Sequence, residues 1–228
     1  MQVGVDLAEI GVRELNRRLH ELTPEADESD WRISNPRGGH NIAVGVRQPV
    51  SLVIHGHVGY YCGGMNQHAE VNIKGHAGVG VAENIMSGVV TIEGNASSSA
   101  AASGRGGLVV IRNNAGSRCG ISMKGVDIVV GGSVGHMSAF MAQAGRLVVC
   151  GDAGPGLGDS IYEAEIFVRG KAADLGSDCV EKEMSVEQGD DLAALLQRSG
   201  FDADPTSFRM FGSARRLYNF DVDNAGSY

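Results

Sequence analysis

Apolar residues recur through the middle of the chain at a fixed spacing of 19 positions. From Leu52 to Met184, seven 19-residue units follow one another without an insertion. In each unit the first and third positions are Leu, Ile or Val, which is the alternation of a β-strand with one buried face. The first positions are Leu52, Val71, Val90, Val109, Ile128, Leu147 and Ile166. The third positions are Ile54, Ile73, Ile92, Ile111, Val130, Val149 and Val168.

A constant period with this alternation predicts a solenoid, because each unit then occupies the same place one layer further along. A leucine-rich repeat would show its Leu/Asn signature, and a propeller blade would need about 40 residues. We therefore predict an all-β fold, a single-stranded parallel β-helix of seven 19-residue coils, right-handed by the usual crossover chirality. The seventh position of every unit is Val or Ala, which fits a narrow interior.

The fifth and sixth positions of each unit carry a second regular pattern. The fifth is Gly except where Asn113 replaces it. We expect a bend with positive φ there, since Asn tolerates that region best after Gly. The sixth is polar in every unit, and we expect these side chains to point into solvent. They are His57, His76, Asn95, Asn114, Ser133, Asp152 and Lys171.

Both ends of the chain depart from the repeat. Residues 1–39 are predicted to form an N-terminal helix, with Asp6 and Glu9 as a capping pair, followed by a polar linker and an extended loop through Trp31. Residues 40–184 form the β-helix domain. Residues 185–228 are predicted to form a helix that Ser185 caps and Gly200 ends, followed by an aromatic docking tail.

Two apolar features lie outside the predicted core. Residues 201–228 hold six of the twelve aromatic residues, interleaved with arginines, a mixture typical of buried interface anchors. The second position of each unit should face outward, yet it is apolar from Val110 to Phe167. An exposed apolar stripe indicates a contact surface. Two alternatives stay open, and both can hold at once: contacts with partner subunits, or a tail that folds back along its own β-helix. The tail residues concerned are Phe201, Phe208, Arg209, Phe211, Arg215, Arg216, Tyr218, Phe220 and Tyr228.

Composition narrows the class of protein. The chain has 228 residues, 34 of them Gly, and a net charge of −8 with no basic tract, which argues against nucleic-acid binding. It has no apolar run long enough to cross a membrane and no signal peptide at its start, so we expect a cytoplasmic protein. Cys62 and Cys119 would lie three coils apart, about 14 Å, so no disulfide is expected.

Candidate chemistry is sparse. His55, His57 and His76 could approach a metal, but a site needs further ligands, and we expect none. The glycines from Gly154 to Gly158 lack the strand–loop–helix context of a dinucleotide loop. Residues 97–99, all Ser, are expected to form a turn. Asp152 and Glu163 would be the candidate carboxylates if the chain were an autonomous β-helix enzyme acting on polysaccharide, although it has no insertions to build a cleft.

The Gly-x-x-Gly layers resemble a known family. From Gly56 and Gly59 to Gly151 and Gly154 they are similar to the GXGXG domain of glutamate synthase, which also occurs as a subunit of formylmethanofuran dehydrogenase; the resemblance covers residues 40–184. The flanking segments, residues 6–16 and 212–220, resemble those of the stand-alone GXGXG subunit of N-methylglutamate synthase.

The resemblance implies a structural subunit without catalytic, cofactor-binding or metal-binding residues of its own. It implies two partners, a class II glutamine amidotransferase-like subunit and an FMN-binding glutamate-synthase-like subunit. Whether a partner also holds an iron–sulfur cluster stays open. The implied complex makes N-methylglutamate from glutamate and methylamine and releases ammonia. The alternative within the family is the equivalent subunit of a glutamate synthase or a formylmethanofuran dehydrogenase. The amidotransferase nucleophile would be an N-terminal Cys, whereas this sequence begins with Met1, so we expect the chain not to be the amidotransferase.

Overall fold

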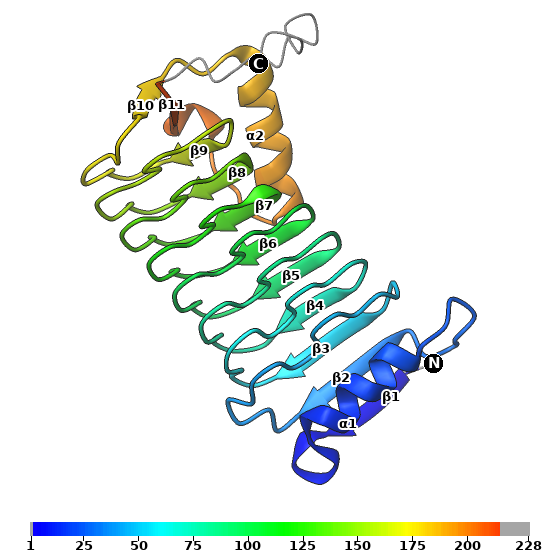
Figure 1. Cartoon of the computed structure of the whole chain (residues 1–228). Coiled ribbons are helices and arrows are strands. Elements are labelled where there is room, and N and C mark those ends of the chain that lie inside the picture. Colours follow the sequence, from blue (N-terminus) through cyan, green and yellow to red (C-terminus); the bar gives the residue numbers. More distant parts are fainter. Residues whose placement is uncertain (1, 215–228) are drawn as a thin grey trace, which may run out of the picture.

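A computed structural model describes residues 2–214, and it confirms the predicted parallel β-solenoid. Successive parallel strands stack along one sheet that runs the length of the molecule (Figure 1). These strands are β1 (Gln2–Asp6), β2 (Asp30–Ser34), β3 (Ser51–His55), β4 (Glu70–Ile73), β5 (Val89–Ile92), β6 (Leu108–Ile111), β7 (Lys124–Val130), β8 (Ala144–Val149) and β9 (Glu165–Val168).

The 19-residue register of the sequence is the register of the sheet. Leu52 pairs with Val71, and Val71 pairs with Val90, each 19 residues further on. The seventh positions form a second line of parallel bridges, beginning with Val58 and Ala77. First and third positions point inward and are almost fully buried, so each coil closes around a narrow apolar core. Small residues at the seventh position allow the opposite wall to approach.

The N-terminal end contains more strand than the sequence predicted. The helix expected over residues 1–22 is confirmed only for Leu7–Glu21, and the extended loop expected through Trp31 is wrong. Residues 2–6 form β1 and residues 30–34 form β2, with Trp31 paired to Leu52 and fully buried. Each strand therefore adds a layer before the first 19-residue unit, outside the strict period that revealed the others.

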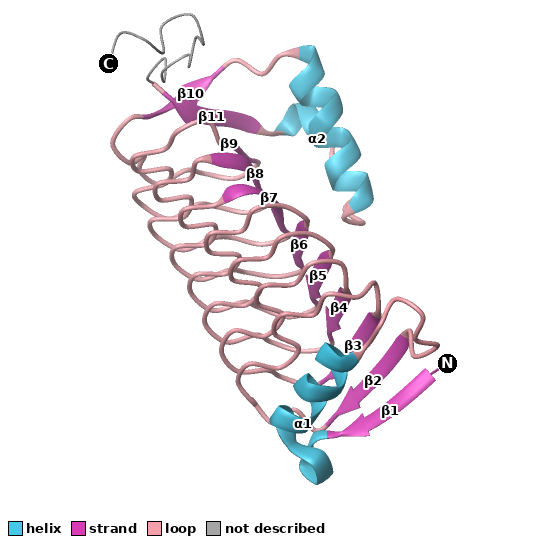
Figure 2. Ribbon diagram, turned by 45° about the vertical axis from the view of Figure 1, so that its right-hand side comes forward, coloured by secondary structure: helices cyan, strands magenta, loops and turns pink. Residues whose placement is uncertain are grey.

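Helix α1 (Leu7–Glu21) joins these two strands (Figures 1 and 2). Of the predicted capping pair, Asp6 is confirmed as the N-cap: its side chain accepts a hydrogen bond from the Ala8 amide at 2.8 Å. Leu15 and Leu19 are buried in the same core as the coils. Because an open solenoid end would expose apolar interior, this helix acts as a cap.

The C-terminal end reverses direction. Strand β11 (Arg209–Ser213) pairs antiparallel with β9 and with β10 (Cys179–Lys182), so the sheet ends in an antiparallel pair. Along the chain, α2 (Val186–Arg198) and a short 3₁₀ turn (Pro205–Ser207) connect β10 to β11. Ser185 and Gln188 form a capping box at the start of α2, and Gly200 follows its end with φ +71°, as the sequence predicted.

The apolar stripe at the second position is covered by the chain itself. Val110, Val129, Val148 and Phe167 are at most 2% exposed, and they pack in one cluster with α2 and β11. From this tail Phe208 is buried, and the ring of Phe201 lies 5.0 Å from the Arg112 guanidinium. Of the two open alternatives, the described residues therefore support the tail that folds back. Arg215, Arg216, Tyr218, Phe220 and Tyr228 lie outside the described residues.

The glycines at the fifth position serve a different purpose from the one predicted. Only Gly56 has a clearly positive φ, +134°, so the expected bend is wrong for the other units. A Cβ on Gly94 would lie 2.3 Å from the His76 Nδ1 and 2.7 Å from the Gly75 oxygen. Close approach between layers therefore requires glycine. At Asn113 the interlayer N–O distance is 3.3 Å, the longest at this position.

Positive φ occurs instead in the turn that follows, where few residues are glycine. In successive coils the tenth, twelfth and fourteenth positions have φ of about +50° to +70°; Ser99, Ala101 and Ser103 have φ of 60°, 55° and 55°. Such backbone disfavours side chains by roughly 1–2 kcal/mol per residue, and the interlayer hydrogen bonds must compensate. This zigzag turns side chains of alternate residues outward.

Candidate functional site

The polar column at the sixth position is a hydrogen-bond ladder rather than a row of freely solvated side chains. His57 Nδ1 accepts a hydrogen bond from the His76 amide, and His76 Nδ1 accepts one from the Asn95 amide, both at 2.9 Å. The two imidazole rings stack with centroids 4.7 Å apart. A neutral imidazole with its proton on Nε2 is required, because Nδ1 must present a lone pair.

The ladder continues to the last coil with other side chains in the same role. Asn95, Asn114, Ser133 and Asp152 each accept a hydrogen bond from the backbone amide one coil further on, at 2.7–3.0 Å. The last acceptor, Asp152 Oδ1, binds the Lys171 amide at 2.7 Å. A short polar acceptor is therefore needed in each layer, which explains why His, Asn, Ser and Asp can all occupy this position.

The remaining sequence candidates do not assemble into a reactive cluster. No group of three His, Cys, Asp or Glu residues within residues 2–214 is arranged to hold a metal ion. Glu163 is exposed, in a different part of the coil from Asp152, whose carboxylate is engaged in the ladder. Ser98 shares a hydrogen bond with the Ser117 hydroxyl at 3.0 Å. Leu157, within the glycine-rich segment, is buried and bridges to Leu175 as part of the stack.

The four cysteines are buried free thiols. Burial raises the pKa of Cys62 and Cys119 to about 12 and that of Cys179 to about 11, so few thiolates form near neutral pH. The opposite shift occurs on α1, where hydrogen bonds from Arg17 and Arg18 lower the pKa of Glu14 to about 2. Glu14 belongs to an exposed set of helix ion pairs, which accounts for its pKa without any catalytic role.

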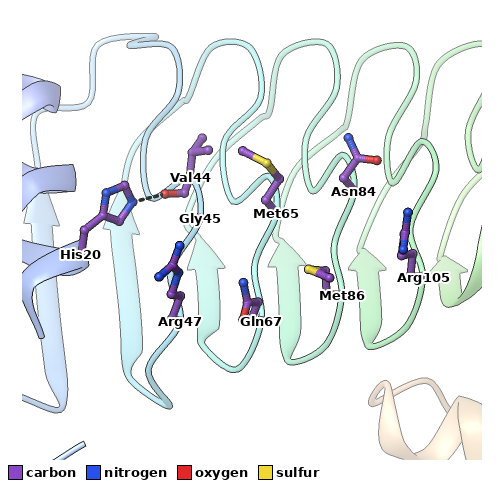
Figure 3. A pocket seen from close by; sticks show the side chains of 9 residues that line it. All are labelled: His20, Val44, Gly45, Arg47, Met65, Gln67, Asn84, Met86 and Arg105. Atoms are coloured by element: carbon purple, nitrogen blue, oxygen red, sulfur yellow. Dashed lines mark hydrogen bonds between the residues drawn. The ribbon is translucent and has the colours of Figure 1, made fainter. Parts of the chain in front are cut away.

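An open groove of about 580 Å³ runs across the first coils on the side of the zigzag turns (Figure 3). Two rows of outward side chains form it, one on each side of a buried residue. One row contains Gly45, Met65 and Asn84; the other contains Arg47, Gln67, Met86 and Arg105. Val46, Asn66 and Ile85, between the rows, are fully buried.

Backbone hydrogen bonds hold the second row in register. The Gln67 amide donates to the Val46 oxygen at 3.0 Å, the Met86 amide to the Asn66 oxygen at 2.8 Å, and the Arg105 amide to the Ile85 oxygen at 2.7 Å. Arg47, Gln67, Met86 and Arg105 are therefore structurally equivalent residues of four successive layers. At about 4.8 Å per layer, the backbone positions of Arg47 and Arg105 are roughly 14 Å apart.

The N-terminal cap closes one end of the groove. His20, on α1, contacts the Val44 carbonyl oxygen through Nε2 at 2.7 Å and lies beside the first layer (Figure 3). Asn16 of the same helix binds the Asn41 oxygen at 2.7 Å and the Ala43 amide at 2.9 Å. These contacts fix the helix against the coil, so the groove is preformed rather than dependent on a mobile loop.

Sequence reasoning missed this groove. The sixteenth positions of the units, which are Gln67, Met86, Arg105 and Lys124, form a row that can be read from the sequence. Arg47 is one residue out of register with this repeat, so the strict period does not place it in the row. Without the stacking of the first coils, the two arginines could not be placed on one line.

The fold and this surface define a class of protein: a rigid β-solenoid with a preformed open groove and without an assembled catalytic cluster in its described residues. No family model matches the chain, and no solved structure matches it. The chain is 56% identical over 225 residues to Protein GlxC of Rhizobium meliloti strain 1021, an alignment that covers 98% of this chain and 99% of that protein. The chain belongs to the same family as this GlxC protein.

Neither helix in the described part of the chain is both long enough and apolar enough to span a membrane.

Proposed function

We propose that this chain is the structural, non-catalytic subunit of a glutamate-synthase-related complex, of the N-methylglutamate synthase type. In this proposal it lies between an amidotransferase-like subunit and an FMN-binding synthase subunit and holds them at a fixed separation. The partners carry the chemistry that joins glutamate and methylamine and releases ammonia. FMN, and an iron–sulfur cluster where the complex has one, belong to a partner.

The observation that carries this proposal is the uninterrupted stack of Gly-x-x-Gly layers. It supports the resemblance to GXGXG subunits, because the glycines are required by close interlayer contact and not by a local turn. Backbone pairing from β1 to β9 and the side-chain ladder both run along the molecular axis. A rod bonded in this way transmits position without bending, which is what a spacer between two enzymes needs.

The proposal is tested by reconstitution. The chain is co-expressed with the proposed flavoprotein and amidotransferase-like partner subunits, and the mixture is analysed by size-exclusion chromatography with flavin absorbance. We expect all three chains to co-elute, and the two catalytic subunits to elute separately when this chain is omitted. Flavin should stay with the synthase subunit when the complex is dissociated.

Two results would contradict the proposal. One is a stable complex of the catalytic subunits that excludes this chain. The other is a colourless monomer that cleaves polysaccharide, the activity of the autonomous β-helix enzymes; no pair of carboxylates in the described residues favours it.

A further inference from the structure

We infer that the groove lined by Arg47, Met65, Met86 and Arg105 binds an extended acidic segment of a partner polypeptide. This inference rests on the proposed function, since it assigns a docking surface to the scaffold. It adds the face of the molecule that is used and the chemistry of the segment that is bound.

Charge is the first argument. None of the nine residues that line the groove is acidic, although the chain as a whole carries a net charge of −8. Neither Arg47 nor Arg105 has a carboxylate partner within residues 2–214. Six of the other eleven arginines of the described chain do: Arg17, Arg18, Arg32, Arg112, Arg146 and Arg209. Two unpaired guanidinium groups in a preformed groove call for anionic groups on a partner, since Arg binds carboxylates with a planar fork of donors.

Spacing is the second argument. A single small anion cannot bridge two arginines whose backbones are about 14 Å apart. An extended peptide rises about 3.4 Å per residue, so side chains four residues apart lie about 14 Å apart on the same face. Acidic residues at positions i and i+4 of an extended segment therefore match Arg47 and Arg105 along the axis of the solenoid.

The apolar residues between the arginines specify the middle of that segment. Met65 and Met86 are 49% and 45% exposed, among the most exposed large apolar side chains of the described chain. Both line the groove between the two arginine layers (Figure 3). Methionine adapts its shape to a partner side chain and loses unfavourable exposure when covered. The residue at i+2, which points the same way as i and i+4, is therefore expected to be apolar.

Nucleic acid is a poorer match for the same groove. A phosphate backbone would require a longer basic track, and only Lys124 extends the row of Arg105 by one layer before neutral Gln143 follows. The exposed methionines also favour an aliphatic side chain over a sugar–phosphate chain.

The experiment uses the full-length protein and a defined probe. A fluorescein-labelled nine-residue peptide carries Glu at its third and seventh positions, Leu at its fifth and Ser or Gly elsewhere, and its binding is measured by fluorescence anisotropy at low salt. We expect saturable binding that Arg47→Glu with Arg105→Glu weakens at least about tenfold, because each reversal replaces attraction by repulsion. Met86→Ser should weaken it by a smaller factor.

Matched controls separate the groove from net charge. Arg37→Glu with Lys171→Glu makes the same change in charge at two exposed residues outside the groove, and binding should be retained. A peptide with Gln in place of both Glu residues should not bind. The thermal midpoint of every variant is measured as well. It should be unchanged, because every substituted side chain is exposed.

Three outcomes would overturn the inference: no binding of the acidic peptide to the wild-type protein, equal loss in both charge-reversal pairs, or tighter binding of a single-stranded oligonucleotide than of the peptide. The reconstitution described above is scored separately. If the three-subunit complex forms and the peptide does not bind, the docking surface is wrong and the scaffold role stands. If the peptide binds and no complex forms, the proposed function is wrong.

Discussion

The outer face of the sheet is divided into two regions by one position of the repeat. At the second position the early coils have Val53, which is buried, and Asn72 and Thr91, which are half-buried. The later coils have Val110 to Phe167, which are buried in one cluster with α2 and β11. Residues 19 apart pair in both regions, although the later coils have a register shift between Lys124 and Asp127. The tail therefore packs on the part of the sheet where four successive layers have an apolar side chain at this position.

The two ends of the molecule also differ in which of their surfaces are covered and which are exposed. The covered region is stabilised by leucines of α2, chiefly Leu192, Leu195 and Leu196, which are almost fully buried. The open region carries the groove with its unpaired arginines. The C-terminal end therefore has packing outside the coils in addition to the core within them, and the groove lies toward the N-terminal end.

The largest effect should come from removing the central side chain of the covered region. Phe167 is 0% exposed, packs in one cluster with α2 and pairs in the sheet with Met210 of β11, so Phe167→Ala should lower the free energy of unfolding by about 3–5 kcal/mol. Thr91→Ala, at the same repeat position in the open region, should change it by less than about 0.5 kcal/mol. Guanidinium denaturation followed by circular dichroism measures both. Equal losses of unfolding free energy in the two variants would mean that packing against α2 and β11 adds no stability at this position.

A second prediction concerns a position that both regions share. Gly94→Ala places a Cβ 2.3 Å from the His76 Nδ1, and Gly151→Ala places one 2.6 Å from the Ser133 Oγ. Each should cost roughly 1–3 kcal/mol, because the layers must separate. Gly4→Ala is the matched control, since nothing lies within 4 Å of its added Cβ. A loss confined to one region would show that the stack is not uniformly close-packed.

How far the sequence predicted the molecule follows from the same periodicity. Positions such as Leu52 and Ile54 have a fixed neighbour 19 residues away, so the coils and their core could be read directly. Trp31 in β2 has the same neighbours but stands outside the strict register, and it was assigned to a loop. The ends of a solenoid are therefore where period alone fails.

The functional surface was harder to predict for a physical reason. Outward residues have no periodic constraint, so Arg47 and Arg105 look like isolated surface charges until the layers are stacked. The ladder at the sixth position was visible in the sequence as a polar column. The sequence could not show its hydrogen bonds, because a side chain such as that of His76 can face either solvent or the amide of the next layer. For the tail the sequence left two alternatives open, and the packing of its described residues confirms that this part folds back along its own β-helix.

The interior should respond to alkaline pH alike in both regions. Cys62 lies in an early coil and Cys119 in a later one; both are 0% exposed, and burial raises the pKa of each to about 12. Between the unfolded value near 9 and 12 the unfolded state loses protons that the folded state keeps, so stability falls as pH rises, by about 1.4 kcal/mol per pH unit for each thiol.

Single Cys62→Ala and Cys119→Ala variants should each reduce that slope by the same amount, measured as the guanidinium midpoint from pH 9 to 10.5. Comparing slopes rather than absolute stabilities removes the packing loss of the substitutions. An unchanged slope in one variant would show that its thiol reaches solvent in the folded state.

The smallest effect should come from the ladder that connects the two regions. His76→Ala leaves the Asn95 amide without its acceptor and should cost about 1 kcal/mol, as should Asn114→Ala in the later coils, where the Ser133 amide loses its partner. His76→Asn restores an acceptor of the kind that Asn95 provides one layer further on, so its cost should be below about 0.5 kcal/mol. If His76→Asn is as destabilising as His76→Ala, then this layer is stabilised by the stacking of the His76 ring on His57 and not by the hydrogen bond. The early coils would then differ from the later ones in the ladder as well as in the cover, because only the early coils have imidazoles there.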